Sequence, residues 1–81
     1  MNREKILKDI SIILRQEIFE NDELDISELT SFDDITGWDS FEQVNLLTVI
    51  EEKYKMHFDI SRVRKMKKVR ELIDYICEES K

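Results

Sequence analysis

One serine, Ser40, stands where the clearest helical pattern of this 81-residue chain begins, and its hydroxyl is a group that could do chemistry. With Gln43 three residues later it fits a capping box, in which each side chain satisfies a backbone donor at the start of a helix. Asp39 and Glu42 form an equally good pair, and that register moves Ser40 to the first helical position. There its hydroxyl would point outward, and a phosphate esterified to it would lie over free N–H groups at the positive end of the helix dipole. The sequence thus allows either a structural cap or a phosphoester attachment site.

A catalytic role for Ser40 would need a general base held within hydrogen-bond reach. The only histidine, His57, follows the far end of the same expected helix, and a helix from 40 to 55 separates its ends by roughly 22 Å. No cluster of Cys and His has metal-ligand spacing, Cys77 is expected to be a small apolar residue of the last helix, and a lone glycine, Gly37, excludes a glycine-rich phosphate loop. We therefore predict that the chain is not an enzyme and binds no metal.

The composition indicates one small helical domain, residues 1–81. Charged residues make up 40% of the chain, proline is absent and glycine occurs once, which favours helices joined by polar loops. A single cysteine allows no internal disulfide and fits a reducing compartment. The N-terminus does not resemble a signal peptide, and residues 5–14 are too charged for a membrane span. We expect a soluble cytoplasmic protein.

The net charge of −6 is unevenly distributed along the chain. From Glu20 to Glu52 there are eleven acidic residues and no lysine or arginine, whereas Arg62–Arg70 holds six basic residues in nine. Charge blocks of this kind bear on partners more than on the fold. Because the acidic block contains the Ser40 helix, a partner that docks there should be basic. The overall negative charge and the few aromatic residues argue against nucleic-acid binding.

The spacing of apolar residues predicts four helices. The first spans 3–19, the second 40–55 and the last 69–79, while a short third segment begins after a cap at Asp59. Between the third and fourth, Lys67-Lys68 offers no glycine, proline or capping side chain, so we expect these two helices to be nearly continuous. The residues expected to face the core are Ile6, Ile10, Ile13, Leu14, Ile18, Leu46, Leu47, Ile50, Tyr54, Ile60, Val63, Met66, Val69, Leu72, Ile73 and Ile76. Those expected to face solvent include Asp9, Glu42, Gln43, Glu51 and Glu52.

A long connection, residues 20–39, links the first two helices. Its regularly spaced apolar residues should pin it to the core, and they are Leu24, Ile26, Leu29, Phe32 and Ile35. A helical turn is expected at 27–31. Trp38 is expected to close the loop over the end of the bundle, since tryptophan is highly buried on average, with a partner contact as the alternative. The predicted fold is all-α, a small four-helix bundle with three long helices, a short third helix and a long loop between helices one and two.

Three motifs occur together along the chain. They are Gly37-Trp38-Asp39-Ser40-Phe41, then Glu51-Glu52-Lys53-Tyr54 on the helix that follows, and finally Ile73-Asp74-Tyr75-Ile76. Asp-Ser alone is a weak signal. Asp-Ser at a helix start is a specific signal when Glu-Glu follows eleven residues later and Ile-Asp-Tyr-Ile lies in the last helix. Together these motifs resemble the acyl carrier protein family over roughly residues 24–77, and the first helix fits the family less specifically.

The resemblance implies that Ser40 is the attachment point for 4′-phosphopantetheine, which a phosphopantetheinyl transferase would donate from coenzyme A. The thiol of that arm would carry acyl groups as thioesters between enzymes, as in fatty acid or polyketide biosynthesis. Asp39 matches the residue before the modified serine. The implied protein is a free-standing monomer whose other partners are acyl-loading and acyl-transferring enzymes with basic docking patches. The positions expected to contact partners are Phe41, Glu42, Val44, Asn45, Thr48, Glu51, Glu52, Arg62 and Lys65.

Several positions depart from the family pattern and bear on which partners are used. Phe41 replaces the usual leucine, and Asn45 and Thr48 stand where many relatives have an acidic residue and a methionine. The third segment is basic here, although it is acidic in many fatty-acid carriers, which favours a dedicated biosynthetic pathway over a housekeeping role; a solvated helix face is the alternative. Two other functions stay open. One is an aminoacyl or peptidyl carrier, and the other is a helical interaction module whose basic segment binds an acidic partner or nucleic acid.

Overall fold

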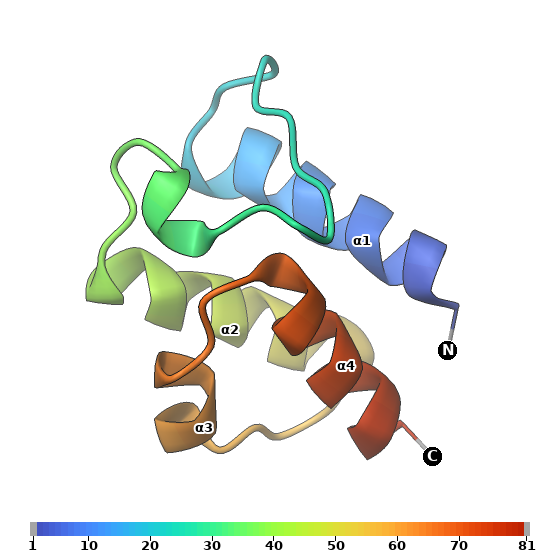
Figure 1. The fold of residues 1–81 in the computed structure, drawn as a ribbon. Coiled ribbons are helices and arrows are strands. Elements are labelled where there is room, and N and C mark those ends of the chain that lie inside the picture. The colour runs from blue at the N-terminus through green and yellow to red at the C-terminus, as the bar shows by residue number, and fades with distance from the viewer. Residues whose placement is uncertain (1, 81) are drawn as a thin grey trace.

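Four α-helices, one π-helical segment and one 3-10 helix make up the helical structure of residues 2–80, which are the residues that this computed structural model describes. In chain order they are α1 (Arg3–Ile12), the π-helical turns η1 (Ile13–Ile18), the 3-10 helix η2 (Phe32–Asp34), α2 (Ser40–Tyr54), α3 (Ile60–Arg64) and α4 (Val69–Glu79) (Figure 1). The predicted all-α fold, with three long helices, a short third one and a long loop before α2, is confirmed. The first predicted helix has the expected extent, but its second half widens into π turns, as the bond from Phe19 N–H to the Leu14 carbonyl shows.

Short polar side chains start three of these helices. Asn2 Oδ1 accepts hydrogen bonds from the N–H groups of Glu4 and Lys5 at the start of α1. Asp59 caps α3 as predicted, accepting from both the hydroxyl and the N–H of Ser61. These two bonds, the hydroxyl first, hold the pKa of the Asp59 carboxyl below its usual value. The third capped helix, α2, carries Ser40 and is described with the site.

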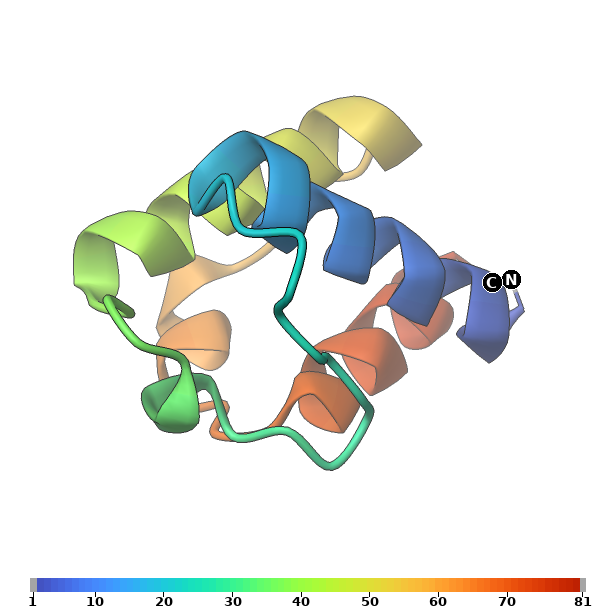
Figure 2. The ribbon, with the colours of Figure 1, turned by 90° about the horizontal axis from the view of Figure 1, so that it is seen from above.

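The core forms where the apolar stripes of α1, η1, α2 and α4 meet. In Figure 2 the loop between η1 and α2 crosses the front of the molecule, while α2 lies at the back. The fully or nearly buried apolar residues are Ile6, Ile10, Ile13, Leu14, Ile26, Phe32, Ile35, Leu46, Leu47, Ile50, Phe58, Val63, Val69, Leu72, Ile73, Tyr75 and Ile76. Most of the predicted core is therefore confirmed, and Phe58 and Tyr75 join it. Within residues 2–80 no helix combines the length and the apolarity that crossing a membrane would need.

Some predictions about individual side chains are wrong. Leu29 is 65% exposed, because it lies in a tight turn in which its N–H is held by the Ser27 hydroxyl. Ile60 is also exposed, since Val63 fills the inward position of the short α3. Asp9 is buried instead of solvent-facing, and it accepts a hydrogen bond of 2.6 Å from the Tyr54 hydroxyl that joins α1 to α2. Burial and then this bond raise the pKa of Tyr54.

The loop before α2 is fastened to the start of α4 by backbone hydrogen bonds. The N–H of Val69 donates to the Thr30 carbonyl at 2.9 Å, and the N–H of Arg70 donates to the Glu28 carbonyl at 2.9 Å. In return, the N–H of Phe32 donates to the Lys67 carbonyl at 2.8 Å. The loop therefore supplies the acceptors that the first amides of α4 need. The expectation that α3 and α4 are nearly continuous is wrong. A turn does lie within 27–31, where the N–H of Thr30 donates to the Ser27 carbonyl at 3.2 Å, but it is a single tight turn, and the first helical residues of the loop are those of η2.

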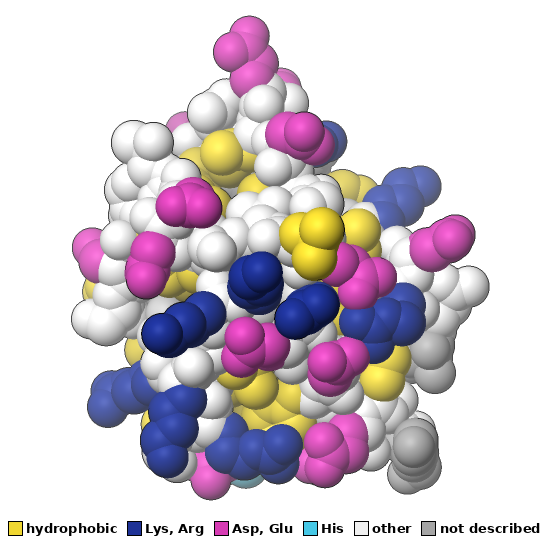
Figure 3. Space-filling view, in the orientation of Figure 1, with side chains coloured by type: hydrophobic (Ala, Val, Ile, Leu, Met, Phe, Trp, Pro, Cys, Tyr) yellow, Lys and Arg dark blue, Asp and Glu magenta, His cyan; other side chains and the backbone are white. Residues whose placement is uncertain are grey.

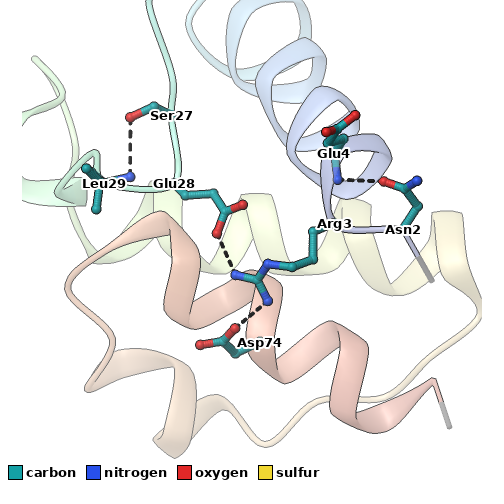
Figure 4. A network of polar contacts seen from close by, with 7 residues as sticks. All are labelled: Asn2, Arg3, Glu4, Ser27, Glu28, Leu29 and Asp74. Atoms are coloured by element: carbon teal, nitrogen blue, oxygen red, sulfur yellow. Dashed lines mark hydrogen bonds and ion pairs between the residues drawn. The ribbon is translucent and has the colours of Figure 1, made fainter.

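Arg3, at the start of α1, forms ion pairs that also hold the loop before α2. The Arg3 guanidinium donates to carboxylate oxygens of both Glu28, in the loop, and Asp74, on α4 (Figure 4). Glu28 is thus held twice, through its side chain by Arg3 and through its carbonyl by Arg70. Three segments that are distant in sequence meet at this point, and the loop reaches α2 from a fixed position.

Aromatic rings close the end of the bundle beside Ser40. Trp38 is half-buried and stacks on Phe32 with ring centroids 4.9 Å apart and planes at 17°, so the packing role predicted for it is confirmed. Phe19 packs at a tilt against the same indole. Gly37 allows the chain to turn here, because its φ of +88° lies in the left-handed region. A Cβ at Gly37 would lie 3.3 Å from Cε1 of Phe19.

Gly37→Ala should lower the free energy of unfolding by about 1–2 kcal/mol, because a non-glycine residue is strained in the left-handed region and its methyl group would press on the Phe19 ring. Urea unfolding followed by circular dichroism measures the loss. Thr36→Ala is the matched control, since Thr36 is exposed and next in the chain, and it should change stability by less than about 0.5 kcal/mol. Equal stability of the two variants would contradict this account of the turn.

Candidate functional site

The start of α2 has the register in which Asp39 is the cap. Asp39 has an extended backbone, and its Oδ1 accepts a hydrogen bond of 2.9 Å from the N–H of Glu42. Ser40 is therefore the first residue of the helix, and its side chain is exposed. Among residues 2–80 the Ser40 hydroxyl has no hydrogen-bond partner. Of the two registers open from the sequence, the structure has the one in which this hydroxyl has no structural task.

Gln43 has a different role from the one that a capping box would give it. Its Nε2 donates to the carbonyl of Val63 at 2.8 Å, which ties the first turn of α2 to α3. The capping box of Ser40 with Gln43 is therefore wrong, and so is the expectation that Gln43 faces solvent freely. Instead, the side chain beside Ser40 fixes the distance between α2 and α3.

The surroundings of Ser40 suit an anionic ester better than they suit catalysis. The amides of Ser40 and Phe41 lie in the first turn, where the helix itself offers no acceptor, and the helix dipole is positive there. His57 follows the other end of α2, where its Nδ1 lies 3.3 Å from a carboxylate oxygen of Glu51. The length of α2, roughly 20 Å, therefore separates it from Ser40 and excludes it as a base for that hydroxyl. In the part of the chain that the structure describes, no group of three or more His, Cys, Asp or Glu residues is arranged to hold a metal ion.

The outward face of α2 exposes apolar side chains near Ser40. Phe41 is 75% exposed, Val44 is 38% exposed, and Thr48 is exposed one turn further on. Their spacing of three and four residues places them on one face of the helix. Asn45 and Glu42 are half-buried beside this face, and Glu52 is exposed further along it. The structure therefore brings together six of the residues expected to contact partners. They are Phe41, Glu42, Val44, Asn45, Thr48 and Glu52.

A groove of about 640 Å³ borders this face and was not predicted. It lies between α2 and the segment that leads into α3, and Val44, Thr48, Phe58, Ile60 and Tyr75 are among its lining residues. Ile60, which the sequence placed in the core, is exposed here, so the apolar surface continues from α2 onto α3. The only feature of the sequence that indicates this groove is the apolar residue Ile60, directly after the Asp59 cap.

Glu51 is not a freely exposed docking residue. Its carboxylate accepts a hydrogen bond of 2.8 Å from the N–H of Phe58 and lies beside His57, and its side chain is only 25% exposed. The prediction that it faces solvent is wrong, because the chain returns over it after α2 ends at Tyr54. Glu51 fixes the connection between α2 and α3, whereas Glu52 next to it is exposed.

The basic residues after α2 differ in how they are held. Arg62 forms an ion pair of 3.5 Å with Glu78 and lies 4.1 Å over the Tyr75 ring, so α4 already engages it. Lys65 is exposed and lies instead on a groove next to Ser40, together with Arg64 and Lys67. Figure 3 shows lysine and arginine side chains gathered over α3 and the start of α4, while acidic side chains cover the loop above them. The two predicted basic contacts are therefore in different environments.

Asp39→Ala should destabilise the protein by about 1 kcal/mol, since it removes the cap of α2. Ser40→Ala should change stability by less than about 0.5 kcal/mol, because the hydroxyl makes no contact. Urea unfolding of the two variants beside the parent tests the register. A larger loss for Ser40→Ala than for Asp39→Ala would contradict it.

Glu51→Ala should cost about 1 kcal/mol, because the half-buried N–H of Phe58 loses its acceptor. Glu52→Ala is the matched control, as the same substitution one residue away on an exposed site. It should leave the midpoint of thermal unfolding unchanged within error. If both variants unfold at the same temperature, Glu51 has no structural role.

Solved structures of acyl carrier proteins resemble this chain over nearly its whole length. No protein-family model and no curated protein matches the sequence. The crystal structure of an acyl carrier protein from Thermotoga maritima superposes with a TM-score of 0.84 at 23% identity, covering 98% of this chain and 91% of that one. The solution structure of a holo acyl carrier protein from Geobacter metallireducens superposes with a TM-score of 0.78 at 33% identity, covering 90% and 83% of the two chains. With this fold, and with 33% identity to that relative over the aligned residues, the chain belongs to the acyl carrier protein family.

Proposed function

We propose that this protein is an acyl carrier whose Ser40 bears 4′-phosphopantetheine. The observation that carries the proposal is the cap of α2. Asp39 satisfies the helix start, so the Ser40 hydroxyl is exposed, without a structural partner, at the positive end of a helix of 15 residues. The relative from Geobacter metallireducens is a holo protein, which supports the same expectation for this member of the family.

The residues at the start of α2 fit such a group. When bound, it supplies a flexible arm with a terminal thiol that carries acyl groups as thioesters. Ser40 provides the ester oxygen, and the first-turn amides of Ser40 and Phe41 face the side on which a phosphate would lie. The negative carboxylate of Asp39 is directed to the N–H of Glu42, which engages one of its oxygens and lessens its repulsion of a phosphate.

The outward face of α2 is the proposed docking surface for partner enzymes. Phe41 and Val44 form its apolar centre, Thr48 continues it with its hydroxyl bonded to the Val44 carbonyl, and Glu42 and Glu52 give it negative charge. Such a surface suits a transferase and acyl-transferring enzymes that present an apolar contact ringed by basic residues. Charge complementarity of this kind mainly sets the encounter rate and the choice of partner. Its position around Ser40 would bring each enzyme to the root of the arm.

The basic stretch after α3 supports a dedicated biosynthetic pathway. A general carrier that visits many basic partners gains from negative charge around its serine, whereas Arg64, Lys65 and Lys67 add positive charge on one side of Ser40. That positive charge would repel some basic docking patches and so restrict the set of partners. We infer a carrier that serves few enzymes.

Incubating the protein with coenzyme A, magnesium and a broad-specificity phosphopantetheinyl transferase should increase its intact mass by one phosphopantetheine. Ser40→Ala should show no increase, because the ester oxygen is gone. Ser61→Ala is the matched control, since Ser61 also lies in the first turn of a helix that an aspartate caps, and it should be modified like the parent. No mass increase with several transferases, or modification of Ser40→Ala, would refute the proposed function.

A further inference from the structure

Leu29, in the loop before α2, is 65% exposed in a turn whose backbone is fixed on both sides. The N–H of Leu29 donates to the Ser27 hydroxyl at 3.2 Å (Figure 4). The N–H of Ser27 in turn donates to the Thr30 hydroxyl at 2.9 Å. A single exposed leucine is common on protein surfaces. This one belongs to a rigid turn, so its position relative to its neighbours is constant.

The start of α4 lies directly beside this turn. The carbonyls on either side of Leu29 accept backbone hydrogen bonds of 2.9 Å from α4. Glu28 accepts from Arg70, and Thr30 accepts from Val69. The exposed leucine and the residues that open α4 therefore form one surface.

Three cations of the segment that pairs with this turn are free. They are Lys67, Lys68 and Arg70, and none of them has an ion-pair partner in the described part of the chain, whereas Arg3 does. Lys67 and Arg70 are exposed, and Lys68 is half-buried. Figure 3 shows lysine and arginine side chains gathered over the start of α4. Leu29 and these three residues are called the cationic face below.

The acids of the two paired segments are already engaged. Segments 28–32 and 67–71 contain two acidic residues, Glu28 and Glu71. The carboxylate of Glu28 pairs with Arg3, and that of Glu71 accepts from two backbone N–H groups at 3.4 Å. The charged side chains left to pair with a ligand are therefore the cations.

We propose that the cationic face is a docking site for a partner protein whose surface has carboxylates around an apolar recess, with Leu29 in the recess. Lysine and arginine side chains pair with carboxylates, and charge complementarity across an interface selects the partner. Interfaces combine polar contacts with an apolar centre, and Leu29 supplies the apolar contact. The proposal goes beyond the carrier function, because it needs no arm on Ser40.

A membrane or a nucleic acid fits this face less well. One leucine supplies little apolar surface for insertion among lipids, and stable attachment takes more than one such signal. The net charge of −6 also opposes binding to an anionic lipid surface. Proteins that bind single-stranded nucleic acid stack bases on aromatic rings, and the only aromatic residue of the two paired segments, Phe32, is buried.

The cationic face begins beside Ser40. Lys67 lines a groove of about 470 Å³ together with Ser40, so a protein docked on this face lies next to the start of α2. The apolar residues of the α2 docking surface, Phe41 and Val44, belong to neither paired segment. The carrier thus presents two faces of opposite charge, one for basic enzymes and one for an acidic partner.

The test titrates the unmodified ¹⁵N-labelled protein with a helical peptide of leucine and glutamate, in which the leucines form one face and the glutamates flank it. This acidic peptide should shift the amides of Leu29, Lys68 and Arg70 and leave those of α2 unchanged. A peptide with lysine in place of every glutamate should instead shift the amides of Phe41 and Val44. The effect of the acidic peptide should disappear in about 1 M NaCl, where the Debye length falls to about 3 Å.

A matched pair of variants tests the leucine. Leu29→Ser should weaken binding of the acidic peptide about fivefold, because an apolar contact is lost. Ile60→Ser is the control, since Ile60 is also an exposed apolar residue but lies outside the cationic face, and it should bind like the parent. The amide spectrum of each variant shows first that it is folded.

A second matched pair tests the charges. Lys67→Gln/Arg70→Gln should weaken binding of the acidic peptide about tenfold, because two of the three free cations are gone. Lys8→Gln/Lys53→Gln removes two exposed cations outside the cationic face and should leave the affinity unchanged. Equal loss of affinity in both variants would mean that only the overall charge matters, and would overturn the proposal.

The remaining outcomes are also decisive. Absence of amide shifts with the acidic peptide, or binding that Leu29→Ser leaves unchanged, would refute the docking site. Larger shifts of the same amides with phosphatidylglycerol vesicles or a DNA duplex than with the peptide would refute a protein as the occupant. If the transferase fails to modify Ser40 while the acidic peptide binds as described, the proposed function fails and this inference stands.

Discussion

The position of Ser40 depends on the backbone pairing between the long loop and the start of α4. Carbonyls of Glu28 and Thr30 accept from the first amides of α4, and the N–H of Phe32 reaches back to Lys67. These bonds satisfy donors that a helix start otherwise leaves unpaired, so neither segment is stable in this form without the other. The fixed loop then holds the stacked rings of Phe32 and Trp38, and both residues line a small cavity together with Gln43 of α2. The serine at the start of α2 thereby acquires a defined orientation in a chain of only 81 residues.

The sequence predicts the helices well and their connections poorly, and the physical reason is the range of the interactions. The local periodicity of apolar residues predicts the stripes Ile6–Ile10–Ile13 and Leu72–Ile73–Ile76. The fold buries both stripes, because burial of apolar area is the largest favourable contribution to folding. The break between α3 and α4 has only a weak local signal, the Glu71 carboxylate that accepts from the N–H groups of Lys67 and Lys68 at 3.4 Å. Its shorter bonds go to carbonyls that lie about forty positions earlier in the chain. Leu29 and Ile60 show the complementary error: an apolar side chain at the correct spacing stays exposed when a tight turn or a short helix cannot direct it inward.

The site was predictable in its centre and less so at its edges. Asp39 and Ser40 are adjacent in sequence, so the choice between two caps was visible, and only the register remained for the structure to decide. Glu51 was misjudged because its partner is the N–H of Phe58 after the helix has ended, a contact that helical spacing cannot indicate. Gln43 was misjudged for the same reason, since Val63 lies twenty residues away. When the hydrogen-bond partner of a side chain lies more than one helix turn away in the sequence, the sequence does not indicate whether that side chain is exposed or bonded.

The two surfaces beside Ser40 carry opposite charges, and this separation matters more than the net charge of −6. A single value for the whole chain predicts attraction of basic partners everywhere. At physiological ionic strength, however, exposed charges act over only about 8 Å, so the acidic face of α2 and the cationic face around Leu29 influence what touches each of them separately. The bond from Gln43 to Val63 keeps the two surfaces in register, because it ties the helix that carries the serine to the helix that leads into the cations.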